Sequence, residues 1–152
     1  MKKIVLACLL TLPLLANDKL IELYESKTCG CCDLWAKYMQ EKGYTLKVHK
    51  SDDFMQVKYK MNIKPEFQSC HTGIIAGYAI EGHMSESAVS WLLKEKPKNV
   101  IGLAVPGMPQ GSAGMEQGFE DEEYPVIVMM KDGSSKLYGI YKGQKLIQKG
   151  EI

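Results

Sequence analysis

A crowded cysteine motif stands between a segment with strand character and a segment with helix character. The motif, Thr28–Cys32, reads Thr-Cys-Gly-Cys-Cys and contains a C-x-x-C pair formed by Cys29 and Cys32. The preceding residues, Leu20–Glu25, alternate in the manner of a β-strand. In Asp33–Lys42, apolar residues recur at the spacing of one helix face, and a glycine that can end the helix follows. The sequence therefore predicts a strand that turns into a helix at the cysteines.

That position affects the chemistry of the thiols. Free backbone N–H groups and the helix dipole favour negative charge at a helix N-terminus, so thiolates form more easily there than in open chain. Gly30 allows a tight turn that lets neighbouring sulfurs face one centre. A single tetrahedral zinc is usually held by two spaced cysteine pairs, whereas three ligands in four residues suit several bridged ions better. Soft thiolates select Cu(I), zinc or iron–sulfur clusters.

The rest of the chain alternates between strand and helix patterns. Strands are predicted at 44–49, 71–75 and 78–80, helices from about 53 to 62 and from about 85 to 96, and a final hairpin from 126–130 and 136–141. The second helix is expected to bury Phe54, Val57 and Met61, and a flexible Gly/Pro/Met-rich loop spans Pro106–Gly118. We find no internal repeat or linker, so residues 17–152 are predicted to form a single α/β domain.

The order of these elements is β-α-β-α-β-β-α, followed by the loop and the hairpin. With a cysteine motif between the first strand and the first helix, this order resembles the thioredoxin fold with an added C-terminal loop and hairpin. Proteins of that fold place the segment before the third strand against the active-site turn. The resemblance therefore implies that Cys70, just before the predicted third strand, approaches the other three cysteines and completes a cluster of four thiols.

The first sixteen residues, Met1–Ala16, have the features of a secretory signal peptide. Lys2 and Lys3 precede an apolar run that is too short to cross a bilayer, and Ala16 offers a small residue for cleavage. The alternatives to a secretory signal peptide are a buried N-terminal strand or helix and a lipoprotein signal at Cys8. Cleavage after Ala16 leaves 17 lysines, 18 acidic residues and four cysteines, hence a net charge near −1. We expect an exported, periplasmic protein without a membrane span in the mature chain.

Composition excludes several classes of partner. The 152-residue chain has a formal charge of +1, and all of its basic residues are lysines. Without arginine and without a block of like charges, it offers no patch for nucleic acid or for a membrane surface. Export also disfavours an iron–sulfur cluster, and copper is the soft metal that an exported protein meets as a hazard.

Two interpretations without copper stay open at this point. Four cysteines in an exported protein often form two structural disulfides. The spacing of Cys29 and Cys32 is instead typical of redox pairs, so a thiol–disulfide oxidoreductase that needs no metal is the second candidate. A passive store of zinc or copper is a third, weaker hypothesis.

Further ligands are sought among histidines and methionines. His71 follows Cys70 directly but is expected to point to the opposite face of the strand, because side chains alternate. His83 lies in a loop after the predicted hairpin. Met108 and Met115 lie in the Gly/Pro-rich loop, and thioethers also select Cu(I). All four are candidates for extra ligands or for groups that orient the ligands.

Several motifs in order and in register resemble the CopG family of periplasmic copper-resistance proteins, many of which are known only as a domain of unknown function. These motifs are Tyr24–Cys32, Ser69–Thr72, Gly77-Tyr78, Glu81–His83, Gly102–Pro109, Gly111-Ser112 and Gly114–Glu116. The resemblance covers about 20–141, and the one departure is Ala113, where proline is expected.

The resemblance implies a thioredoxin-like domain with a copper–thiolate centre. Carried over to this sequence, its ligands are Cys29, Cys31, Cys32 and Cys70. The softness of thiolates and the crowding of the cysteines add the expectations that the copper is Cu(I) and that several ions share the sulfurs. The implied role is copper handling, including a copper–thiol oxidoreductase activity with a periplasmic copper-transfer or thiol-redox partner.

Overall fold

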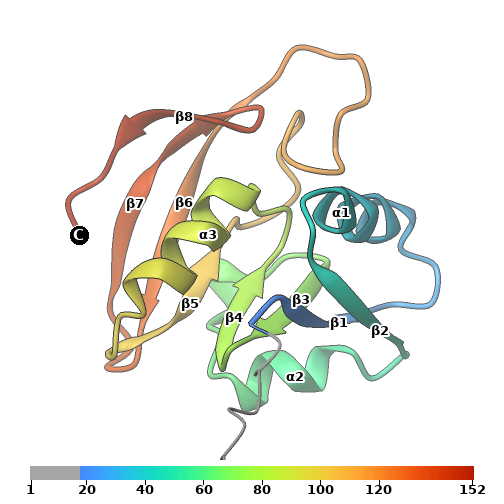
Figure 1. The fold of residues 1–152 in the computed structure, drawn as a ribbon, viewed down its shortest axis with the longest axis horizontal. Helices are drawn as coiled ribbons and strands as arrows, with labels where there is room; N and C mark the ends of the chain where they lie inside the picture. The colour runs from blue at the N-terminus through green and yellow to red at the C-terminus, as the bar shows by residue number, and fades with distance from the viewer. Residues whose placement is uncertain (1–17) are drawn as a thin grey trace, which may run out of the picture.

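Eight strands form one continuous mixed sheet in the computed structural model, which describes residues 18–152 (Figure 1). The predicted signal peptide, Met1–Ala16, lies outside the described residues. The strands are β1 (Leu20–Glu25), β2 (Thr45–Lys50), β3 (His71–Ile75), β4 (Tyr78–Glu81), β5 (Val100–Ala104), β6 (Glu123–Met130), β7 (Ser135–Lys142) and β8 (Lys145–Lys149). The helices are α1 (Gly30–Glu41), α2 (Met55–Lys60) and α3 (Glu86–Glu95), with a 3₁₀ turn at Pro65–Phe67. The predicted α/β class is confirmed.

The order of elements from β1 to α3 agrees with the predicted order. In the sheet the strands are arranged β2-β1-β3-β4-β5-β6-β7-β8. Strands β1 and β2 are parallel, β3 runs antiparallel to both β1 and β4, and β5 is parallel to β4. From β5 onward every neighbouring pair is antiparallel. The carboxyl end of β1 and the start of β3 therefore lie side by side. Cys29, Cys31 and Cys32 follow β1, and Cys70 directly precedes β3.

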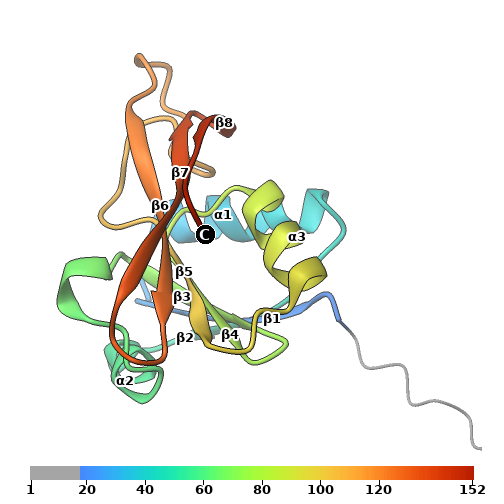
Figure 2. The ribbon, with the colours of Figure 1, turned by 90° about the vertical axis from the view of Figure 1, so that its left-hand side faces the viewer.

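Helices cover both faces of the sheet. Figures 1 and 2 show α1 and α3 on one face and α2 on the other. Between the sheet and the α1–α3 layer, Ile21, Leu23, Trp35, Met39 and Leu92 are fully buried in the larger core cluster. Removing each such side chain from water contributes about 1.5–3 kcal/mol to folding. A smaller cluster on the opposite face contains four buried residues, Ile63, Ala79, Ala104 and Met129.

The C-terminal part continues the sheet instead of forming a separate hairpin. The predicted hairpin is present as β6 and β7, with both strands longer than expected. Strands β5 and β8 were not predicted. The sequence of β5, Val-Ile-Gly-Leu-Ala, lacks polar alternation because this strand is buried on both faces in the middle of the sheet. Strand β8 is a mostly exposed edge strand without an apolar face. In the part of the chain that the structure describes, no helix is long and apolar enough to cross a membrane.

Candidate metal centre

Helix α1 begins inside the cysteine motif, three residues earlier than the apolar pattern predicts. Cys29 is the N-cap residue, and Cys31 and Cys32 occupy the first turn. No side chain caps this end, so backbone N–H groups of the first turn are directed toward the cysteines. Cys32 is fully buried, whereas Cys31 is half-buried. The thiols therefore sit at the positive end of a helix whose inner face, with Trp35 and Met39, is buried in the core.

The structure brings the four predicted cysteines together. Cys29 and Cys32 form a disulfide, and Cys31 and Cys70 are free thiols. The Cys31 sulfur lies 3.6 Å from that of Cys29, and the Cys70 sulfur lies 3.5 Å from that of Cys32. All four sulfurs lie within 4.8 Å of one another, close enough to share a metal ion once the disulfide is reduced. The three sulfurs from the start of α1 and the one from the residue before β3 thus face a common centre.

Two histidines extend the centre beyond the sulfurs. The Cys70 sulfur lies 3.1 Å from Nε2 of His83 and 3.3 Å from Nδ1 of His71. These three residues form a second group of donor atoms within 4.8 Å, and Cys70 belongs to both groups. The expectation that His71 points away from Cys70 is wrong. Cys70 precedes the first paired residue of β3, so the alternation of a regular strand does not separate the two side chains.

The proton on His83 can be located from its partners. Nδ1 of His83 donates to the carbonyl oxygen of Ala113 at 2.8 Å, because a carbonyl can only accept. The lone pair of Nε2 is therefore directed at Cys70. His83 is fully buried, and this burial lowers its pKa. The ring is a neutral imidazole near pH 7, the form that binds metals.

His71 is also buried as a neutral imidazole. Its ring lies 4.6 Å from the Trp35 ring and 4.9 Å from the His83 ring. Burial, followed by repulsion from Lys58 and from His83 whenever His83 is protonated, holds the pKa of His71 well below its ordinary value. Its Nε2 has no hydrogen-bond partner among the described residues. Two uncharged imidazoles thus adjoin the sulfur that links both groups.

The thiol of Cys70 stays protonated without a cation. Burial, and then the charge of nearby Cys31, raise its pKa to about 12. A bound cation would supply positive charge at this buried site and displace the proton. The chemistry of the donor set, thiolates with neutral imidazoles, suits a soft metal such as Cu(I).

The loop between β5 and β6 packs against this centre. Its middle residues Ser112 and Ala113 are fully buried, so this part is not the flexible segment that its composition predicts. Met115 is buried as well, whereas Met108 is 55% exposed. Figure 1 shows the loop passing close to α1. The predicted roles of the two methionines as ligands stay predictions.

A buried carboxyl group near the centre was missed by the sequence analysis. Glu25 ends β1, pairs with His71 in the sheet register, and has a fully buried side chain. Nζ of Lys50 lies 3.3 Å from Glu25 and 2.7 Å from Asp33. Burial raises the pKa of Glu25 despite this lysine. The strand alternation already placed Glu25 on the inner face with Ile21 and Leu23, and that signal could have identified it.

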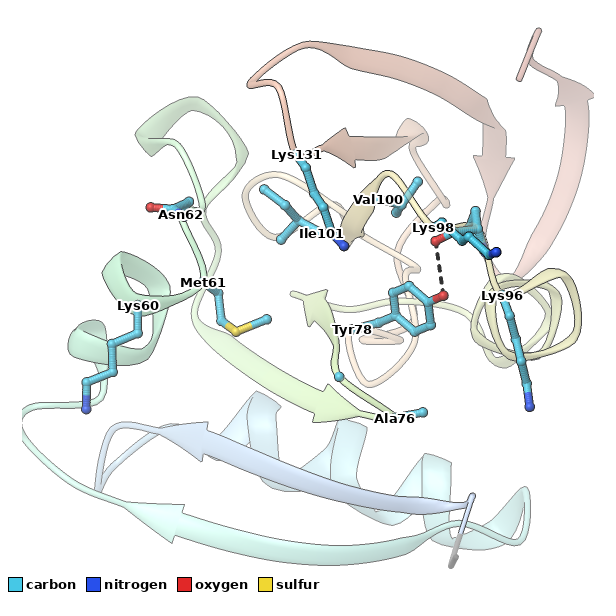
Figure 3. A pocket seen from close by; sticks show the side chains of 12 residues that line it. Lys60, Met61, Asn62, Ala76, Tyr78, Lys96, Lys98, Val100, Ile101 and Lys131 are labelled. Carbon is cyan, nitrogen blue, oxygen red and sulfur yellow. Dashed lines mark hydrogen bonds between the residues drawn. The ribbon is translucent and has the colours of Figure 1, made fainter.

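A groove of about 680 Å³ lies elsewhere on the molecule, between the β3–β4 turn, the end of α3 and the start of β5 (Figure 3). None of the residues that line it belongs to the groups of metal-donor residues. Four lysines surround it, but Figure 3 shows Lys131 pointing inward while Lys60 and Lys96 point away. Their ammonium groups do not converge on one ligand.

Comparisons with known proteins agree with the chemistry of the cysteine cluster. A family described as "Protein of unknown function, DUF411" matches residues 67–115, which include Cys70, both histidines and most of the packed loop. Two solved structures, described as "Copper resistance protein copG- Form 1" and "Form 2", are each 33% identical to this chain with a TM-score of 0.76. The alignments cover 82% and 80% of this chain, and 98% and 97% of those chains. A search of curated proteins found no match.

Proposed function

The chain belongs to the family of the copper resistance protein CopG, and on that premise we propose that it is an exported protein that binds Cu(I). Its ligands are the thiolates of Cys29, Cys31, Cys32 and Cys70. The protein sequesters the copper or cycles it between oxidation states, and in this way contributes to copper resistance.

The observation that carries this proposal is the mutual approach of four sulfurs within 4.8 Å. Four thiolates without a bound cation would repel one another in a half-buried site, whereas Cu(I) ions that share the sulfurs neutralise their charge. Because Cys70 also lies within 3.3 Å of nitrogens of His71 and His83, the imidazoles are the next ligands in reach. This double membership of Cys70 supports a centre with several copper ions. Met108 and Met115 are the candidates for thioether ligands.

The disulfide gives the centre a redox step. Cleavage of the Cys29–Cys32 bond takes two electrons and two protons and yields two thiols. Two Cu(I) ions supply these electrons when each is oxidised to Cu(II), with the protons drawn from solvent. In the reverse direction, the two thiols reduce two Cu(II) ions to Cu(I), close the disulfide and release two protons to solvent. The protein would then act as a copper–thiol oxidoreductase with Cys29 and Cys32 as the reacting pair.

Two broader features complete the proposal. Strands β1–β4 with their sheet order β2-β1-β3-β4, and helices on both faces, support a thioredoxin-like unit that β5–β8 extend. We place the protein in the periplasm on the signal-peptide features of Met1–Ala16. There a copper-transfer or thiol-redox partner would exchange metal or electrons with the exposed side of the centre.

Anaerobic titration of the reduced protein with Cu(I), in competition with a chelator, tests the proposal. We expect more than one tightly held copper per chain. Less than one copper per chain would refute it. Cys70→Ser should lower both the number of ions and their affinity, because this sulfur links the two groups of donors. Unchanged uptake in that variant would remove Cys70 from the centre. His49→Gln is the control, because this histidine on β2 belongs to neither group of metal-donor residues.

A thiol–disulfide oxidoreductase without metal is the second candidate, favoured by the disulfide that Cys29 and Cys32 form. This candidate predicts turnover of a dithiol substrate by carefully demetallated protein, with full activity in Cys31→Ser. The copper proposal predicts that Cys31→Ser impairs the protein and that demetallated protein has no thiol turnover. Measuring the thiol turnover of the wild type and of Cys31→Ser, each with and without copper, separates the two candidates.

A further inference from the structure

A buried ion pair lies directly behind the segment that carries Cys70. Lys58 of α2 and Glu81 of β4 are both fully buried, and Lys58 Nζ lies 2.5 Å from Oε1 of Glu81. Lys58 is the one residue of α2 that is buried, although the apolar pattern predicted Val57 for the inner face. Nothing in the proposed copper chemistry uses this pair.

The carboxylate of Glu81 collects donors from three elements. Its Oε1 accepts hydrogen bonds from Lys58 and, at 2.7 Å, from the backbone N–H of Ser69. Its Oε2 accepts from the hydroxyl of Thr72 at 2.6 Å, and Lys58 also donates to that hydroxyl oxygen at 2.9 Å. Ser69 and Thr72 flank Cys70 and His71. Glu81 thus binds the chain on both sides of two metal-donor residues.

Other contacts hold the same segment from the opposite side. The Ser69 hydroxyl donates to the carbonyl oxygen of Gly107, and the N–H of Gly107 donates to the carbonyl of Gln68 at 3.2 Å. Gly82 has a φ of +74°, and a Cβ atom there would lie 2.7 Å from the Ser69 side chain and 2.5 Å from the Val105 carbonyl oxygen. Ser69 is therefore enclosed between β4 and the exit from β5, and Glu81 fixes its N–H.

Stability alone does not account for such a pair. Taking two charges out of water is costly, and apolar residues of similar volume often serve equally well or better. What apolar residues cannot replace is the acceptor for the Ser69 N–H, which has no strand partner because β3 begins at His71. The pattern of donors thus indicates a positional role.

We propose that the Lys58–Glu81 pair positions Cys70: Glu81 fixes the backbone on both sides of Cys70 and His71, and Lys58 holds the Glu81 carboxylate in place. Glu81 and Lys58 are positioning residues that act through Ser69 and Thr72. The inference rests on the proposed copper site for its consequence in metal binding. The placement of the Cys70 thiol itself does not depend on copper.

Two double variants separate position from charge. Lys58→Met with Glu81→Gln removes both charges but keeps an oxygen that accepts from Ser69 and an amide that donates to Thr72. Lys58→Met with Glu81→Met removes the acceptor as well. Neither variant leaves an unpaired buried charge, which is the change that most endangers folding.

The first readout is metal-free. In copper-free, disulfide-containing protein, the free thiols among residues 18–152 are Cys31 and Cys70. The alkylation rate of Cys70 is therefore measured by peptide mapping, with Cys31 as the internal reference. We expect Lys58→Met with Glu81→Gln (the Gln variant) to keep the wild-type ratio of the Cys70 alkylation rate to the Cys31 rate. Lys58→Met with Glu81→Met (the Met variant) should raise this ratio roughly tenfold, the effect of losing one hydrogen bond to a charged acceptor. Equal ratios in both double variants would overturn the proposal.

Copper uptake and hydrogen exchange complete the test. The Met variant should bind fewer copper ions, as Cys70→Ser does, and the Gln variant should bind the wild-type number. If the wild type binds no copper, the proposed function fails while the alkylation ratio still decides the positional role. In the wild type, the Ser69 amide should exchange slowly although it lies outside any strand, a result that needs no variant. Rapid exchange of this amide would contradict the proposal.

Discussion

Gly114→Ala tests whether the packed loop holds the histidine side of the metal centre. Gly114 has a φ of +81°, and a Cβ atom there would lie 2.7 Å from the backbone nitrogen and 3.0 Å from Cα of Trp35. Trp35 of α1 is fully buried, so its backbone cannot move aside. The loop must therefore move away from the helix, and the carbonyl of Ala113, which accepts from His83, must move with it.

The expected cost can be worked from these contacts. A left-handed conformation costs an alanine about 1–2 kcal/mol. Loss of the hydrogen bond from His83 to Ala113 adds about 1 kcal/mol. Gly118→Ala is the matched control, because Gly118 lies in the same loop with a φ of +80° and no atom within 4 Å of its added Cβ. We expect a loss of about 2–3 kcal/mol at Gly114 and of about 1–2 kcal/mol at Gly118.

Thermal unfolding of the copper-free protein measures the difference. For a chain of this size, about 1 kcal/mol shifts Tm by roughly 2–4 °C, so Gly114→Ala should lower Tm by several degrees more than Gly118→Ala. Gly114→Ala should also weaken copper binding by the histidine side, and Gly118→Ala should leave it unchanged. Equal shifts in Tm, or intact copper affinity in a destabilised Gly114→Ala, would refute this account of the loop.

Three further predictions follow from the buried groups. Burial raises the pKa of Glu25 above its ordinary value of 4.5, so the ionised carboxylate destabilises the folded protein as the pH rises above 4.5. Glu25→Gln should therefore raise Tm at pH 7, and this gain in Tm should disappear near pH 4.5. Because the Cys70 pKa is about 12, copper binding at pH 7 should release its proton, and Cys70→Ser should release at least one proton fewer in a pH-stat titration. Trp35→Phe removes the indole N–H that donates to the carbonyl oxygen of Met84 at 2.9 Å. Chemical denaturation should show a loss of about 1–3 kcal/mol in the free energy of unfolding, and an unchanged midpoint would contradict this prediction.

Local patterns predicted the elements around the cysteines well. The bounds of β1 agree with the alternation of Leu20–Glu25, because this strand has one face toward a core and one toward polar surroundings. Helix α1 starts earlier than its periodicity because first-turn residues such as Gly30 and Cys31 carry no apolar pattern. Strand β5 escaped detection for the opposite reason, since a strand buried on both faces shows no alternation.

The candidate site was predicted less evenly. Cys29, Cys31 and Cys32 are neighbours in sequence, so their proximity needed only a turn, whereas the approach of Cys70 needed the resemblance to a known fold. The contact of His71 with Cys70 was missed because it depends on where β3 begins, to within one residue. The Lys58–Glu81 pair was invisible to pattern analysis, because a single charged residue in an amphipathic segment normally faces solvent.

The long loop that covers the centre has a consequence for the timing of biosynthesis. A chain is made and exported from its N-terminus, so the cysteines of α1 emerge well before Ala113 and the strands β6–β8 that follow it. Strand β5 and strand β6 hold the two ends of the loop, and β6 must pair before the loop can settle. Until then the thiols lack their cover and are open to oxidants and stray metal. A newly made chain is therefore most vulnerable in the interval before its last third has folded.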